Sequence, residues 1–174
     1  VWISDGSDNF RVENADKSDR GTEIHILLKQ DAAEFASEWK LKQIVKKYSD
    51  FVRYPIFVGD DQANQQESLW RKRSSEIEAD EYKQFYQQMT MDFEEPLTTI
   101  HFASDAPVHL RALLFVPAKR EPGILAQRKE PGVMLYSHNV LIQEYCTELL
   151  PDWLNYIDGV VDSFLISGHQ GGGN

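Results

Sequence analysis

The stretch that decides the fold is residues 21–58, GTEIHILLKQDAAEFASEWKLKQIVKKYSDFVRYPIFV. Its first part, Gly21 to Lys29, predicts a strand, because β-branched and apolar residues from Thr22 to Leu28 fall on one face at a two-residue period. A long amphipathic helix should follow, from Asp31 to about Val52. The stretch therefore predicts a strand and a helix packed as part of an α/β layer.

The predicted helix carries its own start and stop signals. Asp31 can accept a hydrogen bond from a backbone N–H of the first turn while Glu34 reaches back, which is the logic of a capping box. Pro55 disfavours a helical conformation at Tyr54, so the helix should end before that residue. Apolar residues recur at three- and four-residue spacings and form a stripe that needs a partner surface. The stripe consists of Phe35, Trp39, Leu41, Ile44, Val45, Tyr48, Phe51 and Val52.

The composition is that of a folded protein. The 174 residues are 41% hydrophobic and 11% aromatic, which supplies enough apolar side chains for a core. The formal net charge of -10 disfavours binding to nucleic acid or to an anionic membrane. No apolar run is long enough to span a membrane, and the first residues have no signal-peptide pattern. The single cysteine, Cys146, excludes an internal disulfide and fits a reducing, cytoplasmic compartment.

Two further regions flank residues 21–58. Residues 1–4 and 9–12 predict a hairpin of two short strands, joined by the turn-forming residues Asp5 to Asp8. Residues 59–68, GDDQANQQES, are acidic and have no periodicity, which predicts a linker. A second globular region should therefore start near Leu69.

The second region predicts one helix and several strands. An aromatic stripe on the helix from Ala79 to Met89 is expected to pack in a core rather than to form a ligand site. Residues 146–156 should be helical in part, and residues 164–174 have no packing pattern. The segments with strand patterns are 97–103, 108–116, 132–142 and 159–163, of which the first two should form an antiparallel hairpin.

Catalytic constellations are scarce in the sequence. The five histidines are dispersed, without the short spacings typical of metal ligands, so no metal site is predicted. The adjacent carboxylates Asp60–Asp61 and Glu94–Glu95 favour solvated charge, because the members of an acid/base pair must converge from different elements. Cys146 lies among apolar residues, which favours a small buried side chain over a nucleophile. A small cytosolic hydrolase that uses Cys146 or paired carboxylates is kept as an alternative hypothesis.

Several separated motifs give the chain a specific resemblance. They are RGTEI at 20–24, LLK at 27–29, EWKLKQIVKKYSDF at 38–51, YPI at 54–56, LWR at 69–71, EYKQFY at 81–86, DF at 92–93, EPL at 95–97, LLFVP at 113–117, Tyr136, LLP at 149–151 and GVVDS at 159–163. Over about residues 1–163 the sequence resembles the heat-shock protein 90 chaperones, and most closely their bacterial HtpG branch. The motifs occur in the family's order, from the end of its ATP-binding domain into the first part of its middle domain.

The resemblance implies a fold class and a domain organisation. We expect an α/β (α+β) fold, in which residues 1–53 form part of a GHKL-type ATPase sheet with its helix. Residues 54–68 would be an extended exit and an acidic linker. Residues 69–163 would form part of a middle domain with a mixed sheet and flanking helices, followed by an atypical tail, 164–174. The two α/β clusters should make few contacts across residues 59–68.

The resemblance also implies site residues. Thr22 would lie at the edge of the adenine pocket and Ile24 would contribute to its apolar wall. Trp70 would contact client proteins and a neighbouring domain, and Ile124 and Leu125 would form the apolar tip of a client-binding loop. The alternatives are that Thr22 and Ile24 are ordinary sheet residues and that Trp70 is half-buried at the start of a domain.

The parent family is a homodimeric, ATP- and Mg-dependent chaperone of the heat-shock response. The resemblance places the rest of the nucleotide pocket before Val1 and the catalytic arginine after Ser163, so we expect this chain to contain no catalytic residue and to bind neither ATP nor Mg by itself. The first hypothesis is a fragment of a chaperone that binds and remodels unfolded or partly folded client proteins. The second is a client- or partner-binding module without catalysis.

Overall fold

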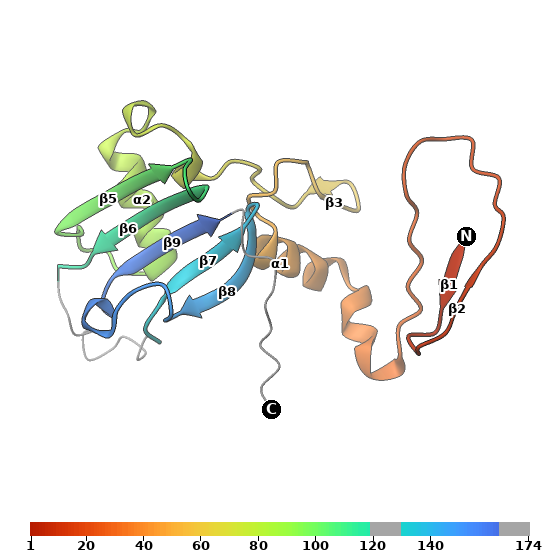
Figure 1. Ribbon diagram of the computed structural model, residues 1–174. Coiled ribbons are helices and arrows are strands. Elements are labelled where there is room, and N and C mark those ends of the chain that lie inside the picture. The colour runs from red at the N-terminus through yellow and green to blue at the C-terminus, as the bar shows by residue number, and fades with distance from the viewer. Residues whose placement is uncertain (119–129, 164–174) are drawn as a thin grey trace. The chain divides into compact units, whose positions relative to one another are not determined.

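The computed structural model describes residues 1–118 and 130–163, and its elements are shown in Figure 1. The chain divides into two compact units, Val1–Ala33 and Glu34–Asn174. This division falls earlier than the expected boundary in residues 59–68. The assignment of residues 1–53 and 69–163 to two parts of the family's architecture stays a prediction.

The first unit contains the predicted hairpin. Strands β1 (Trp2–Ser4) and β2 (Phe10–Val12) pair antiparallel, with Trp2 opposite Val12. The Trp2 and Phe10 rings stack at 6.2 Å between centroids, so the two strands share an apolar contact although both side chains are exposed.

The predicted strand from Gly21 to Lys29 is wrong for this structure, because the segment has no regular secondary structure. Among the described residues no strand pairs with it, and Ile24 is 76% exposed. A two-residue apolar period stabilises a strand only when a neighbouring strand takes up its backbone hydrogen bonds and another element covers its apolar face. Neither is available here.

The predicted helix forms in two pieces. A 3-10 helix, η1 (Gln30–Ala36), precedes the α-helix α1 (Glu38–Tyr48), so Asp31 is not the cap of the α-helix. Ser37 caps it instead, because its Oγ accepts a hydrogen bond from the Lys40 N–H at 3.1 Å. Helix α1 also ends before Val52, and none of its residues is buried: Trp39 of the predicted stripe is 68% exposed.

The stretch expected to be a linker has a defined structure. Strands β3 (Phe57–Val58) and β4 (Asp61–Gln62) form a small hairpin. The side chain of Asn64 joins it to the preceding chain: its Oδ1 accepts from the Ile56 N–H at 2.8 Å, and its Nδ2 donates to the carbonyl oxygens of Val52 and Tyr54. Polar composition here provides hydrogen bonds to the backbone rather than flexibility.

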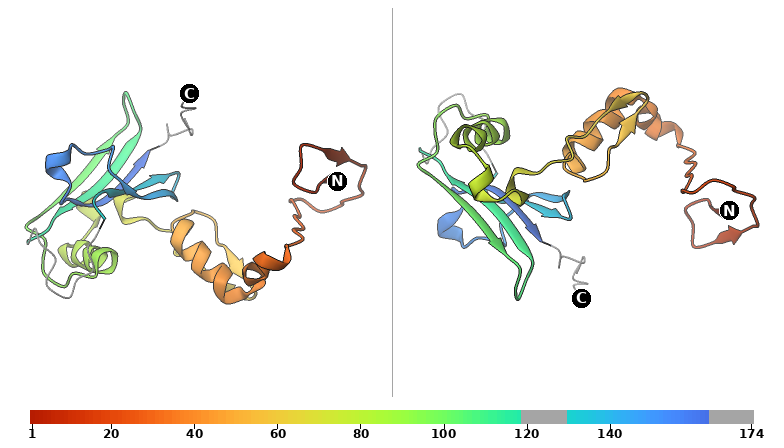
Figure 2. Two further views of the ribbon diagram at one scale, coloured as in Figure 1. Left: turned by 90° about the horizontal axis from the view of Figure 1, so that it is seen from below. Right: turned by 90° about the horizontal axis from the view of Figure 1, so that it is seen from above.

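The larger part of the second unit is a mixed five-stranded sheet. Its order is β5-β6-β9-β7-β8, and every neighbouring pair is antiparallel except β7 and β9, which are parallel. Helix α2 lies on one side of this sheet (Figure 2). These elements are α2 (Ala79–Thr90), β5 (Thr98–Ser104), β6 (Leu110–Val116), β7 (Val133–Ser137), β8 (Val140–Cys146) and β9 (Asp158–Ser163). The α/β class is confirmed, as are the aromatic helix and the β5–β6 hairpin.

Two predictions in this region are refined by the structure. Residues 132–142 are not one strand: His138 and Asn139 have positive φ values of 53° and 66° and make the two-residue turn between β7 and β8. The expected helical content of residues 146–156 consists of the short 3-10 helix η4 (Asp152–Leu154).

The larger core cluster lies between α2 and the sheet, and a smaller one contains Ala112, Val133 and Val161. Phe51, which follows α1, packs against the larger cluster with ring centroids 4.7 Å from Trp70 and 6.0 Å from Tyr136. The expectation of few contacts across residues 59–68 is therefore wrong, because one aromatic cluster includes residues from both sides. The buried members of this cluster are Trp70, Tyr86, Leu113, Phe115, Tyr136, Leu141 and Val160.

Candidate functional site

Trp70 lies at the centre of the core and not on a surface. It belongs to the 3-10 helix η2 (Leu69–Arg71), its exposed fraction is 0%, and Phe51, Phe85 and Tyr136 surround its ring. No part of the side chain can contact a client protein in this structure, so that assignment is corrected. The alternative of a structural tryptophan holds, with deeper burial than expected.

The indole N–H of the buried Trp70 donates a hydrogen bond to a buried carboxylate. Asp162 on β9 is fully buried, and its Oδ2 accepts from Trp70 Nε1 at 3.0 Å and from Arg71 Nε at 2.8 Å. Arg71 Nη2 lies 2.6 Å from the same oxygen. Burying a carboxylate is costly unless charged and polar donors compensate it. Here the donors compensate Oδ2, while Oδ1 is buried without a hydrogen-bond partner among the described residues. The Trp70–Arg71–Asp162 cluster therefore anchors η2 to the sheet.

His101 connects the same region to α2. Its Nε2 lies 3.2 Å from the Trp70 carbonyl oxygen and its Nδ1 lies 2.8 Å from the Tyr82 hydroxyl. A carbonyl oxygen only accepts, so Nε2 carries the proton and Nδ1 accepts from the hydroxyl. Burial raises the pKa of Tyr82, with a smaller contribution from the charge of Glu81, which keeps the hydroxyl a donor. His101 has a structural role, and His109 lies apart from it beside Asp105. Within residues 1–118 and 130–163, no group of three or more His, Cys, Asp or Glu side chains is placed to hold a metal ion.

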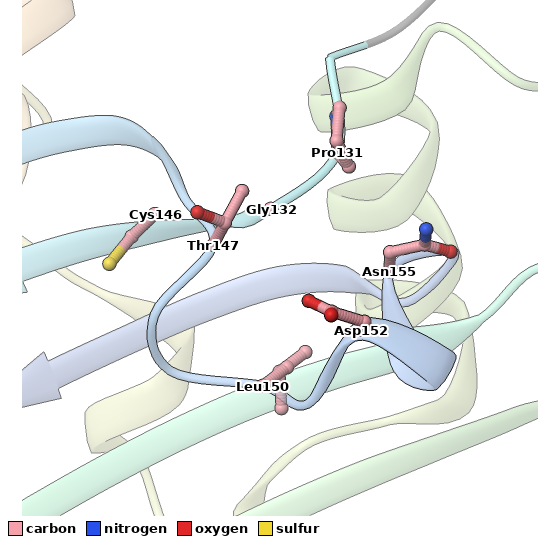
Figure 3. A pocket seen from close by; sticks show the side chains of 7 residues that line it. All are labelled: Pro131, Gly132, Cys146, Thr147, Leu150, Asp152 and Asn155. Carbon is pink, nitrogen blue, oxygen red and sulfur yellow. The ribbon is translucent and has the colours of Figure 1, made fainter.

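A small pocket lies beside Cys146 (Figure 3). Its volume is about 130 Å³, and it is lined by Pro131, Gly132, Cys146, Thr147, Leu150, Asp152 and Asn155. Figure 3 shows the Cys146 sulfur directed away from Asp152 and Asn155. No histidine is among the lining residues, so a thiolate here would lack the adjacent base that activates a nucleophilic cysteine. The buried-residue interpretation of Cys146 is confirmed.

The adjacent carboxylates form surface ion pairs. Asp61 pairs with Lys42 at 2.6 Å, and Glu95 pairs with Lys83. Hydrogen bonds from these ammonium groups are the main reason that the pKa of each carboxyl is lowered. A general acid needs a raised pKa, so neither Asp61 nor Glu95 is suited to that role.

The remaining predicted site residues are not brought together. Thr22 and Ile24 lie in the first unit, in the segment without regular structure, and their nucleotide-binding role stays a prediction. Ile124 and Leu125 lie outside the described residues.

The surface that sequence reasoning missed lies on β5. Ile100 and Phe102 share one face of the strand and are 43% and 49% exposed. Across the β5–β6 ladder Ile100 lies opposite Leu114 and Phe102 opposite Ala112. We call Ile100 and Phe102 the β5 surface; the neighbouring Leu114 on β6 packs against a second core cluster of Ala112, Val133 and Val161. The period-two pattern of residues 98–104 is a signal for a strand, but it does not show that Ile100 and Phe102 stay exposed.

No helix in the described part of the chain is long and apolar enough to cross a membrane.

Comparisons with known proteins point to one family. The family model described as Hsp90 protein matches residues 58–165, which is more than half of the chain. The chaperone protein HtpG of Desulfitobacterium hafniense is 44% identical over 162 residues, which cover 93% of this chain and 26% of that protein. The HtpG proteins of Desulfotalea psychrophila and Chlorobaculum tepidum are 40% and 38% identical, with the same coverage. The chain spans about a quarter of the length of these relatives. By sequence and by the order of its motifs, this chain belongs to the heat-shock protein 90 family of chaperones.

Proposed function

We propose that this chain is part of an ATP-dependent chaperone that binds and remodels unfolded or partly folded client proteins. The observation that carries the proposal is the 44% identity to a chaperone protein HtpG over 93% of the chain. The family's homodimer, its heat-shock response and its cytoplasmic location are part of the same proposal.

The described surface supports client binding by this chain itself. Large apolar side chains stand exposed on several elements, among them Trp39 on α1, Phe102 on β5 and Trp153 in η4. An unfolded protein exposes apolar side chains that such contacts would shield from water. With Trp70 buried, these exposed residues are the better candidates for client contact.

ATP use is proposed for the parent protein and not for this chain alone. By the family resemblance Thr22 and Ile24 contribute to the adenine pocket, while Mg and the catalytic groups are held by other residues of the ATPase domain. Phosphoryl transfer depends on positioned charge and metal. The chain should therefore bind clients without hydrolysing ATP, which is the behaviour of a client-binding module.

Three measurements on the 174-residue chain test the proposal. Light scattering of thermally unfolding citrate synthase should fall when the chain is added in a few-fold molar excess, with bovine serum albumin as the protein control. Isothermal titration with ATP and Mg should give no heat of binding, and a phosphate-release assay should give no turnover. Unchanged aggregation would refute client binding by this chain. Measurable hydrolysis would refute the expectation that the chain does not hydrolyse ATP by itself.

A further inference from the structure

The small pocket of Figure 3 lies where the connection between β8 and β9 passes over the sheet. Leu150, in this connection, packs against the core cluster of Ala112, Val133 and Val161. It also lines the pocket, so the sheet holds one apolar wall in place. Pro131 adds a second apolar wall from the chain that enters β7.

The pocket has room for about one side chain. Its volume of about 130 Å³ is close to that of a cavity of roughly 150 Å³ that binds benzene. A helix or a folded domain cannot enter such a space, whereas one side chain of an extended segment can. The occupant is therefore selected by the groups that line the walls.

One of these groups is a carboxylate. Asp152 lines the pocket, and Figure 3 shows its carboxylate directed toward the same space as the Leu150 side chain. Within residues 1–118 and 130–163 the Asp152 side chain makes no ion pair. A carboxylate beside an apolar wall attracts a cation more strongly than one surrounded by water, because the wall lowers the local dielectric constant.

The chain around the pocket supplies further negative charge. Residues 130–163 contain no lysine or arginine and six carboxylates: Glu130, Glu144, Glu148, Asp152, Asp158 and Asp162. Glu144 and Asp162 pair with cations from other elements. Glu130 and Glu148 adjoin lining residues of the pocket in sequence and form no ion pair with any described residue. The described groups near the pocket therefore favour a basic occupant.

Arginine fits the lining better than lysine does. The Asp152 carboxylate offers two acceptor oxygens, and Asn155 and Thr147, which also line the pocket, offer an amide oxygen and a hydroxyl. A guanidinium group has five N–H donors in one plane and bonds a carboxylate in two places, whereas an ammonium group is a compact, strongly hydrated charge. An apolar side chain would leave the carboxylate desolvated and without a partner.

We infer that this pocket binds an arginine side chain from an extended segment of an unfolded client protein. The guanidinium group lies on Asp152, and the aliphatic stem lies along Leu150 and Pro131. Apolar residues beside the arginine contact Trp153, which follows Asp152 and is 72% exposed. The inference rests on the proposed function, because it names one class of client segment and the place where it binds.

The test uses a fluorescein-labelled peptide, GSLRLSG, and the full 174-residue chain. Binding measured by anisotropy should be saturable, and hydrogen exchange should slow in residues 146–155. Replacing the arginine by citrulline, which keeps the shape and removes the charge, should weaken binding at least tenfold. A peptide with lysine in this place should bind more weakly than the arginine peptide, and equal binding would overturn the choice of arginine.

Variants of the protein provide matched controls. Asp152→Asn should weaken peptide binding at least tenfold, whereas Asp60→Asn should leave it unchanged, because it removes the same charge from an exposed residue in the β3–β4 turn. Asp152→Lys should lose the arginine peptide and gain binding of GSLELSG, a reversal that loss of folding cannot produce. Circular dichroism checks the fold of each variant. Equal binding of GSLRLSG by Asp152→Asn and the unchanged chain would overturn the inference.

Other occupants of the pocket would give other results, each of which contradicts the inference. A dimer in sedimentation equilibrium that Asp152→Asn dissociates would show that a second copy fills the pocket. Peptide binding that appears only after Lys119, Arg120, Arg128 and Lys129 are changed to serine would show that the chain's own segment does. If the peptide fails to bind while citrate synthase aggregation is still suppressed, the inference fails and the proposed function stands.

Discussion

Replacing Asp162 by alanine should destabilise the second unit strongly, because its carboxylate is the common acceptor of Trp70 Nε1 and Arg71 Nε. The Arg71 side chain is only 16% exposed, and the carboxylate is fully buried. Breaking a buried ion pair by removing one partner costs about 3–5 kcal/mol, since the other charge stays buried and loses its main partner. We expect a loss of that size for Asp162→Ala.

Urea unfolding followed by tryptophan fluorescence measures this loss. With a urea m-value of about 2 kcal/mol/M, a loss of about 4 kcal/mol would lower the unfolding midpoint by about 2 M. The double variant Asp162→Leu with Arg71→Met should recover much of the stability, because both charges leave together and apolar atoms fill their space. Asp105→Ala is the matched control: Asp105 also pairs with an arginine, Arg111, but at an exposed site, so its loss should be much smaller.

Two results would refute the reasoning. If Asp162→Ala lowers the midpoint no more than Asp105→Ala, the cluster is not an anchor of η2. If the double variant is less stable than the single variant, the cost lies in something other than the unpaired charge.

Three further predictions concern the local structure. Ser37→Ala should lower the stability of α1 by about 1 kcal/mol, because the substitution removes the hydroxyl that caps the helix. Far-ultraviolet circular dichroism during urea unfolding should detect this loss. Ser37→Asp should keep the wild-type stability, because a carboxylate also caps a helix. Gly159→Ala should destabilise the sheet by about 1–3 kcal/mol, because φ is +149° and a Cβ would collide with the Leu113 carbonyl oxygen; an unchanged melting temperature would contradict this. Burial raises the pKa of Asp50 above its ordinary value of 3.8. At a pH above the raised pKa the buried carboxylate is ionised and lowers the free energy of unfolding by its full amount. Below pH 3.8 the carboxyl is protonated in both the folded and the unfolded chain, so this destabilisation disappears. Asp50→Asn, which can still accept the Gln65 N–H, should therefore be more stable at pH 7 and equal to the unchanged chain below pH 3.8 in chemical unfolding.

Local periodicity predicted the elements whose partners are close in sequence. Helix α2 begins at the expected Ala79 and buries its aromatic stripe, and β5 and β6 pair as a hairpin. In both cases the apolar pattern and the turn residues that define the element lie within a few residues of each other. The resemblance to the heat-shock protein 90 family, which the comparisons confirm, also needed only the sequence.

The predictions that the structure contradicts concern features that depend on residues distant in sequence. The pattern from Gly21 to Lys29 is that of a strand, but it does not form one without a pairing partner. The family resemblance implies client contact for Trp70, but the residues that enclose it, Asp162 and Phe51, are distant from it in sequence. The composition of residues 59–68 predicts a linker, because it does not reveal that Asn64 hydrogen-bonds the preceding backbone.

The amino-acid sequence by itself determined the family, helix α2 and the β5–β6 hairpin, because these depend on composition, motif order and short-range periodicity. The tertiary structure alone decided which apolar residues are covered: it buried Trp70 against Asp162 and left Ile100 and Phe102 in water. The physical reason is that a side chain's exposure is set by whichever elements pack against it, and those elements come from parts of the chain that a local pattern does not include.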